Sequence, residues 1–100
     1  MPGSDNGGMA KEGRKEFILR VLEEVGIPLP TTVVFRACKL NGATFERRTV
    51  DRLLKELGEE GYVMKIDRDA LDEGRIEEVG IEATGYWYIT DRGRGRVLSG

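Results

Sequence analysis

Basic side chains gather in one segment of the chain, residues 36–55, and the chemistry open to them is the binding of anions. Six cations stand there against two anions, a local charge of +4: Arg36, Lys39, Arg47, Arg48, Arg52 and Lys55 against Glu46 and Asp51. A guanidinium can donate two hydrogen bonds at once to a phosphate or to the edge of a guanine. This segment is therefore the candidate nucleic-acid-binding surface.

An amphipathic pattern predicts that a helix over residues 43–61 positions these cations. Its buried stripe, at i, i+3, i+4 and i+7, is Val50, Leu53, Leu54 and Leu57. At about 100° per residue, three cations fall on the opposite side: Arg48, Arg52 and Lys55. Thr44 is expected to cap the start of the helix and Gly61 to end it. Because an ordinary solvated helix shows the same pattern, the stripe alone does not identify a DNA-reading helix.

The residue types that are missing exclude most catalytic sites. The chain has no histidine, the commonest general base and metal ligand, and a single cysteine, Cys38. One thiol cannot form an internal disulfide or a zinc site built on several thiolates. Cys38 lies in an apolar helical run, where packing is more usual than reactivity. No glycine-rich loop ends in Gly-Lys-Ser/Thr, so we expect no enzyme, no metal and no cofactor.

Negative charge is concentrated in a second segment, residues 67–82, which we call the acidic segment. The net charge of the whole chain is −2. In the acidic segment seven carboxylates stand against two cations, a local charge of −5: Asp67, Asp69, Asp72, Glu73, Glu77, Glu78 and Glu82 against Arg68 and Arg75. The positive field is thus confined to the region of one helix, which matters more for nucleic-acid binding than the net charge does.

Length and composition predict one small domain. The chain has 100 residues, of which 39% are hydrophobic and 34% charged. Residues 1–10 are rich in Gly and turn formers and are expected to form a disordered tail, which leaves residues 11–98 as the folded domain. No run is long and apolar enough to span a bilayer, and no signal-peptide pattern opens the chain. We expect a cytoplasmic protein.

Two further helices are expected before residue 43. The first spans residues 11–25, with Phe17, Ile18, Val21, Leu22 and Val25 at helical spacing, Lys and Glu on its other face, and Gly26 as its stop. Prolines 28 and 30 then forbid helix. A second helix follows over residues 33–40, capped by Thr31 or Thr32 and closed by Asn41-Gly42. Two helices joined by a tight Gly-containing turn form a helix-turn-helix.

The second half of the chain changes to strand periodicity. Residues 62–68 alternate with period two, and residues 86–90 contain three aromatic side chains suited to a pleated surface. Residues 72–74 are expected to turn, and residues 75–85 are either strand or loop. The two clear strands predict a long two-stranded hairpin. Residues 91–93 are expected to turn again, with a short helical turn or a tail at 94–98. Of the rings of Tyr86, Trp87 and Tyr88, one is expected to be exposed or covered by another chain.

Three stretches carry a resemblance to a known family. Residues 48–57 (Arg-Thr-Val-Asp-Arg-Leu-Leu-Lys-Glu-Leu) and 59–63 (Glu-Glu-Gly-Tyr-Val) resemble the recognition helix and first wing strand of prokaryotic winged-helix regulators. Residues 88–93 (Tyr-Ile-Thr-Asp-Arg-Gly) resemble the segment that closes the wing. Over residues 12–98 the chain is similar to the small repressor-like winged-helix proteins of haloarchaea and their phages. The resemblance implies an α+β winged helix-turn-helix domain with three helices and a two-stranded wing.

The resemblance also implies a function, the sequence-specific binding of double-stranded DNA as a transcriptional regulator, expected to be a homodimeric repressor. The start of the third helix would enter the major groove. The implied contacts on that helix are Thr44, Arg47, Arg48, Thr49, Arg52 and Lys55. Arg48 is the first choice for a base edge, and Arg52 and Lys55 suit phosphate. The alternative for each cation is a solvated charge or a surface ion pair, such as Arg48 with Asp51.

The acidic segment departs from the family pattern, because a wing tip usually offers Arg or Lys to DNA. Only Arg68 and Arg75 could do so here, against the repulsion of the surrounding carboxylates. The acidic segment could instead serve solubility or bind a protein. A second reading of the whole chain is therefore a winged-helix module that binds a protein partner and does not bind DNA.

Overall fold

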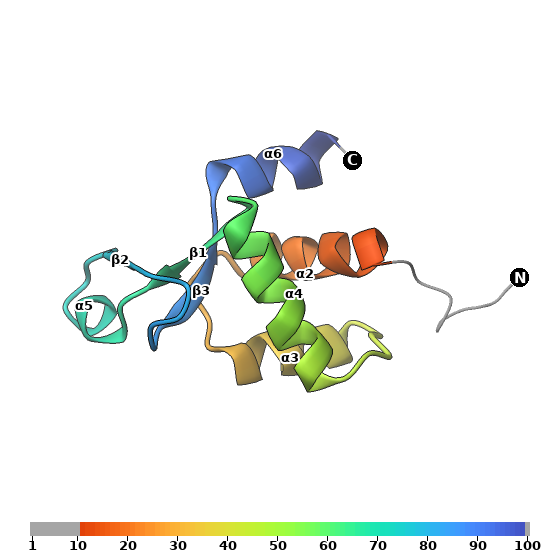
Figure 1. Ribbon diagram of the computed structural model, residues 1–100, viewed down its shortest axis with the longest axis horizontal. Helices are drawn as coiled ribbons and strands as arrows, with labels where there is room; N and C mark the ends of the chain where they lie inside the picture. Colours follow the sequence, from red (N-terminus) through yellow and green to blue (C-terminus); the bar gives the residue numbers. More distant parts are fainter. Residues whose placement is uncertain (1–10, 100) are drawn as a thin grey trace, which may run out of the picture.

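The computed structural model of the protein describes residues 11–99, which form five helices and a three-stranded antiparallel sheet. In chain order these are α2 (Lys11–Val25), α3 (Thr31–Leu40), α4 (Arg47–Glu59), β1 (Val63–Ile66), α5 (Arg68–Asp72), β2 (Glu78–Val79), β3 (Tyr86–Ile89) and α6 (Asp91–Ser99). Figure 1 shows α2, α3 and α4 packed together, with the sheet and α5 reaching out to one side. The expected α+β class is confirmed, and the tail expected at residues 1–10 lies outside the described residues.

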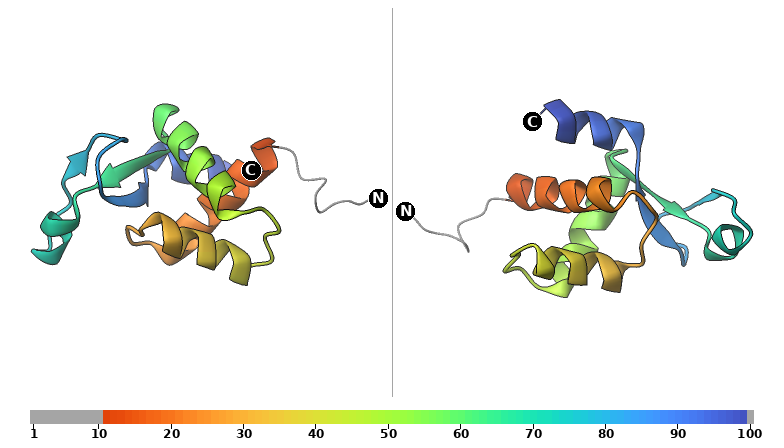
Figure 2. Two further views of the ribbon diagram at one scale, coloured as in Figure 1. Left: turned by 60° about the horizontal axis from the view of Figure 1, so that its bottom comes forward. Right: turned by 180° about the vertical axis from the view of Figure 1, so that it is seen from behind.

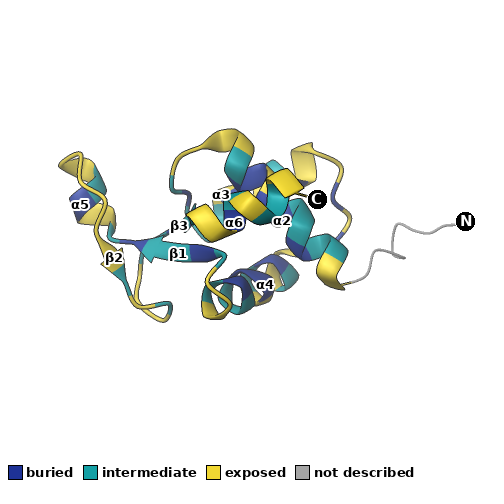
Figure 3. Ribbon diagram, turned by 90° about the horizontal axis from the view of Figure 1, so that it is seen from above, coloured by how far each residue is buried: buried dark blue, intermediate teal, exposed yellow. Residues whose placement is uncertain are grey.

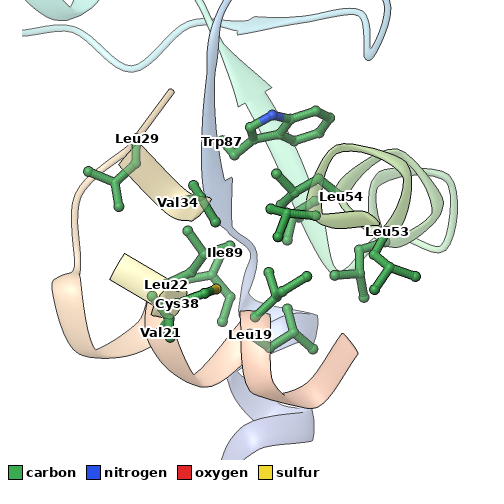
Figure 4. Packing of buried hydrophobic residues seen from close by; sticks show 14 of the residues in the cluster. Leu19, Val21, Leu22, Leu29, Val34, Cys38, Leu53, Leu54, Trp87 and Ile89 are labelled. Carbon is green, nitrogen blue, oxygen red and sulfur yellow. The ribbon is translucent and has the colours of Figure 1, made fainter. Parts of the chain in front are cut away.

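The core lies where the apolar faces of α2, α3 and α4 meet one face of the sheet. All four members of the predicted α4 stripe are fully buried: Val50, Leu53, Leu54 and Leu57. From β3, Trp87 points toward α4, and Ile89 lies beside Leu22 and Cys38 (Figure 4). Val25 was expected to face inward but is 41% exposed, because α2 ends there and the chain turns away at Gly26. Cys38 is buried as predicted, and burial raises the pKa of its thiol to about 12.

The predicted side-chain caps of α3 and α4 are wrong. Helix α4 begins at Arg47, three residues after Thr44, and α3 begins at Thr31, directly after Pro30. Neither helix has a side chain that caps its first turn. The reason at α4 is tertiary: Phe45 is buried and its ring meets that of Phe17 edge to face at 5.7 Å, which holds residues 43–46 outside the helix.

The expected two-stranded hairpin is wrong, because a third strand joins it. The order in the sheet is β2-β1-β3, with Lys65 paired to Val79 on one side and to Trp87 on the other. The ambiguous residues 75–85 therefore include a short strand. Before it, the unpredicted helix α5 begins where Asp67 accepts a hydrogen bond from the Ala70 amide at 2.9 Å.

The free edge of β3 is closed by the connector between α2 and α3. The backbone amide of Trp87 donates to the Leu29 carbonyl at 2.7 Å, and the Leu29 amide donates back at 2.9 Å. The Trp87 ring is fully buried, and its Nε1 donates to Thr31 Oγ1 at 2.9 Å. Tyr86 and Tyr88, which alternate with Trp87, are half-buried on the other face of the sheet. Thr31 thus bonds a ring from β3 instead of capping α3.

Helix α6 is longer than the predicted last turn, since Asp91–Gly93 is its first turn. Thr90 Oγ1 accepts a hydrogen bond from the Gly93 amide at 3.0 Å and donates to the Gly61 carbonyl at 2.7 Å. The same hydroxyl therefore starts α6 and ties it to the end of α4. Farther along α6, Arg96 donates to Glu12 of α2 at 2.7 Å. Figure 2 shows α6 lying alongside α2 from behind.

Lys15 departs from the expected polar face of α2, because it is only 2% exposed. Its Nζ donates to Glu60 Oε2 at 2.9 Å and lies 3.2 Å from Glu56 Oε1, so one ammonium bridges α2 to the end of α4. Burial alone would lower the pKa of Lys15, but the hydrogen bonds to Glu60 and Glu56 outweigh it and raise that pKa above its usual value. The side chain is a buried, charged link between two helices.

Candidate nucleic-acid interface

The face of α4 opposite its leucine stripe is open. The side chains of Arg48, Arg52 and Lys55 are 89%, 59% and 42% exposed. Figure 1 shows α4 in front of α2 and α3, with no other described element drawn across it. The structure therefore brings these three predicted site residues together on one accessible helical surface, which we call the α4 outer face.

The ion pairs on the α4 outer face are loose. Arg48 lies 3.8 Å from Glu46 rather than pairing with Asp51, and Arg52 lies 3.9 Å from Glu56. Lys55 lies 3.6 Å from Asp51. Exposed pairs of this kind contribute about 0–1 kcal/mol, so these cations can exchange their present neighbours for another anion at little cost.

The first turns of α3 and α4 meet at a shallow hollow. Its lining is Thr31, Arg47, Arg48 and Asp51. Because neither helix start is capped by a side chain, the amides of its first two residues remain available to an acceptor, whereas those of Val33 and Thr49 already donate to backbone carbonyls. A helix start carries partial positive charge, and two guanidiniums stand beside these two. The hollow therefore offers two guanidiniums and free amides to a phosphate group, against the single carboxylate of Asp51.

Carboxylates on the flank of α4 are neutralised from α2. Glu56 Oε1 lies 2.9 Å from Lys11 Nζ and 3.2 Å from Lys15 Nζ. The hydrogen bond from Lys11 is the largest cause of a lowered pKa at Glu56, so this carboxylate stays ionised and paired. Glu60 is bound by Lys15 in the same way. These pairs leave the α4 outer face more positive than the composition of α4 alone indicates.

Two predicted site residues lie beside the α4 outer face rather than on it. Thr44 is exposed in the loop that precedes α4. Thr49 is half-buried on the flank of the helix. Both remain near the start of α4, but neither shares the side that carries Arg48 and Arg52.

The two predicted cations of the acidic segment are set apart from α4. Figure 1 shows α5 and β2 at the far end of the molecule, and Figure 3 shows that end as largely exposed. Arg75 donates to Glu73 at 2.6 Å and also binds Glu77. These hydrogen bonds, first from Glu73 and then from Glu77, raise the pKa of Arg75. Arg68 lies 3.9 Å from Asp69. The structure does not bring these two arginines together with the α4 cations.

Lys65 of β1 is a nearby cation that the sequence analysis did not select. Its Nζ lies 4.4 Å from the centre of the Trp87 ring and donates to the Ala83 carbonyl at 2.9 Å. Burial, and then repulsion from Lys55, lower the pKa of Lys65. Lys65 lies near α4 because β1 packs against that helix. Strand alternation was the available signal, since Lys65 and Val63 point to the same face of the sheet.

Residues 11–99 were also compared with the requirements of a metal site and of a membrane-spanning helix. Within that range no cluster of His, Cys, Asp and Glu is arranged to hold a metal ion. None of the helices described there is both long enough and apolar enough to cross a bilayer. Comparison of the chain with protein-family models, with curated proteins and with solved structures finds no match.

Proposed function

We propose that the protein binds double-stranded DNA in a sequence-specific manner as a transcriptional regulator of the winged helix-turn-helix class. The observation that carries the proposal is the α4 outer face, where exposed and loosely paired cations stand on a helix whose other side is anchored in the core. A helix of this kind fits the major groove, with side chains near its start at the base edges. The arrangement of α3 and α4, joined by residues 41–46, suits this mode of binding.

Each predicted site cation of α4 has a proposed role. Arg48, whose side chain is 89% exposed, donates to a guanine edge. Arg47 and the uncapped helix starts hold a phosphate in the hollow between α3 and α4. Arg52 and Lys55 bind phosphates farther along the major groove. Thr44 and Thr49 contact the DNA at the rim of that groove. Arg68 and Arg75 have no role in this proposal, because they lie in the acidic segment, where Arg75 is paired with Glu73 and Glu77 and Arg68 lies beside Asp69.

The regulator is proposed to act as a homodimeric repressor. One α4 reaches few base pairs, whereas a two-fold dimer doubles the contacts on half-sites about 34–36 Å apart. Occupying a promoter is sufficient for repression and needs no second activity. Sedimentation of the protein with and without a two-half-site duplex tests this part, and a 1:1 complex on such a duplex at saturation contradicts it.

The direct test is duplex affinity followed against salt concentration, after selection of preferred duplexes from a random pool. The proposal expects the logarithm of the affinity to fall with that of salt concentration, with a slope of about one per phosphate contact. Arg52→Ala and Lys55→Ala should each reduce the slope by about one. Arg48→Ala should cost about 1–3 kcal/mol on the preferred duplex and relax its sequence preference. Arg20→Ala, an exposed cation on α2, is the matched control.

A second candidate function is protein binding without DNA binding, and the acidic segment favours it. Seven carboxylates there repel a phosphate backbone, and Arg75 is already engaged with two of them. This candidate expects no duplex binding at any salt concentration and no effect of Arg48→Ala. Duplex binding that is lost on Arg48→Ala but kept on Arg20→Ala decides against it.

A further inference from the structure

An apolar groove lies on the face of the sheet that is turned away from α4. It is lined by Gly26, Ile27, Pro28, Leu71, Gly74, Ile76, Tyr86 and Tyr88. Tyr86 and Tyr88 form its floor, because they alternate along β3 with Trp87, which points into the core. The connector after α2 forms one wall, and the acidic segment forms the other. Figure 2 shows this connector from behind, on the side away from α4.

The walls of this groove expose large apolar side chains. Ile27 is 58% exposed and Ile76 is 55% exposed, and they stand on opposite walls. The Ile27 wall is fixed in place, because the backbone of Leu29 is paired with that of Trp87. Exposed apolar residues that face one hollow from both sides are typical of a surface that another molecule covers, whereas single scattered ones are ordinary.

The charges around the groove define what can cover it. On one wall Asp72, Glu73 and Glu77 stand against the single cation Arg75, which leaves a net charge of −2 there. The other wall follows the last turn of α2, which carries no cation. A helix C-terminus adds partial negative charge to that wall. At the edge of the floor, Arg94 is balanced by Asp91 at 3.0 Å and donates to the Tyr88 hydroxyl at 3.1 Å. The rim is therefore acidic along the acidic segment, and the opposite wall offers no cation.

We propose that this groove is the docking site for a segment of another protein in which apolar side chains are flanked by Lys or Arg. The apolar side chains would cover Ile27, Ile76 and the two tyrosines, and the flanking cations would meet the acidic segment. A second copy of this chain fits less well, because neither wall of its groove offers an unpaired cation to the acidic segment. This inference does not depend on DNA binding, since the groove and the α4 outer face lie on opposite sides of the sheet.

The test is selection of displayed random peptides on the full chain, with removal of those that bind the support without the protein. The expected result is enrichment of sequences with apolar residues bordered by Lys or Arg. A synthetic copy of the most enriched peptide is then titrated by fluorescence polarisation. Ile76→Glu should weaken its binding at least about tenfold, since it sets an unpaired carboxylate against apolar groups. Asp72→Asn should weaken it by up to about fivefold, the range of an exposed charge pair.

Leu40→Glu is the matched control, because Leu40 is 88% exposed but lies at the end of α3, outside the groove. It should leave peptide binding unchanged. Thermal melts of all variants check folding, which these exposed positions should hardly affect. The proposal is overturned if the enriched peptides are acidic, or if Ile76→Glu and Leu40→Glu affect binding equally. It is also overturned if the wild type sediments as a dimer that Ile76→Glu dissociates, since that result assigns the groove to a second copy.

Discussion

Lys15 Nζ lies 2.9 Å from Glu60 Oε2, and this contact joins the first described helix to the end of α4. The lysine is 3% exposed at its side chain, whereas the glutamate is 43% exposed. The ammonium is therefore removed from water and depends on Glu60 and Glu56 for its hydrogen bonds. Since α4 carries the proposed DNA-binding surface, this buried charge also holds that surface against the rest of the molecule.

Lys15→Met should reduce the free energy of unfolding by roughly 1–3 kcal/mol, the usual cost of leaving hydrogen-bonded charged groups without their partner. Methionine keeps most of the aliphatic packing, so the loss reports on the charge. Lys11→Met is the control: Lys11 contacts the same Glu56 but is 55% exposed, and its loss should be at most about 1 kcal/mol. Urea denaturation measures both. Equal effects from the two variants contradict a special role for Lys15.

The stability difference between wild type and Lys15→Met should depend on pH at both ends of the range. The pKa of Lys15 is raised above 10.5, so its contribution is complete below pH 10.5 and is lost as pH rises through the folded-state pKa. The pKa of Glu56 is lowered below 4.5, chiefly by Lys11 and to a smaller extent by Lys15, so the part that depends on Lys15 is complete above pH 4.5 and is lost as pH falls through the lowered pKa. Denaturation at several pH values should give a plateau between these limits. If the stability difference between the two proteins is smaller near neutral pH than at either limit, Lys15 does not contribute as a charged partner of these carboxylates.

Gly93→Ala should destabilise the fold through steric overlap. A Cβ at position 93 would lie 2.2 Å from the Tyr62 carbonyl oxygen and 2.7 Å from Ile89 Cγ1. Overpacking of this kind costs about 1–3 kcal/mol or more. Gly95→Ala, two residues along α6, meets nothing within 4 Å and should be neutral or stabilising by up to about 1 kcal/mol, because alanine favours helix. Thermal denaturation of the pair gives the comparison, and matching melting temperatures would be inconsistent with a close approach at Gly93.

The bond between Trp87 and Thr31 should appear as a coupling energy. Thr31→Val keeps the shape of the acceptor but leaves the buried Nε1–H of Trp87 without its partner, which costs about 1–3 kcal/mol. Trp87→Phe removes the donor together with part of the core volume. A double-mutant cycle with urea denaturation should give a coupling of about 0.5–1.5 kcal/mol. Strict additivity of the two substitutions would show that this bond does not contribute to stability.

Local periodicity in the sequence was sufficient to predict helices α2, α3 and α4 and the outward cations of α4. The stripe from Val50 to Leu57 predicts both the buried side of α4 and, by geometry, the exposed side that carries Arg48 and Arg52. The predicted span of α2 matches the structure. Gly42 and Gly61 have positive φ where stops were expected, because few other residues adopt that conformation. Each of these features depends on residues within a few positions of one another.

Contacts between distant residues decided the rest. The local sequence places Lys15 on a solvated face, but the fold brings Glu60, 45 positions later in the chain, within hydrogen-bonding distance of it. The local sequence predicts that Thr31 caps a helix, but in the fold its hydroxyl accepts a hydrogen bond from Trp87, 56 positions away. In the same way β2 becomes a strand because the edge of β1 is there to pair with it. The sequence determined which residues can form helices and carry exposed charge, whereas the tertiary structure decided which polar groups are buried, since burial depends on what packs against a residue.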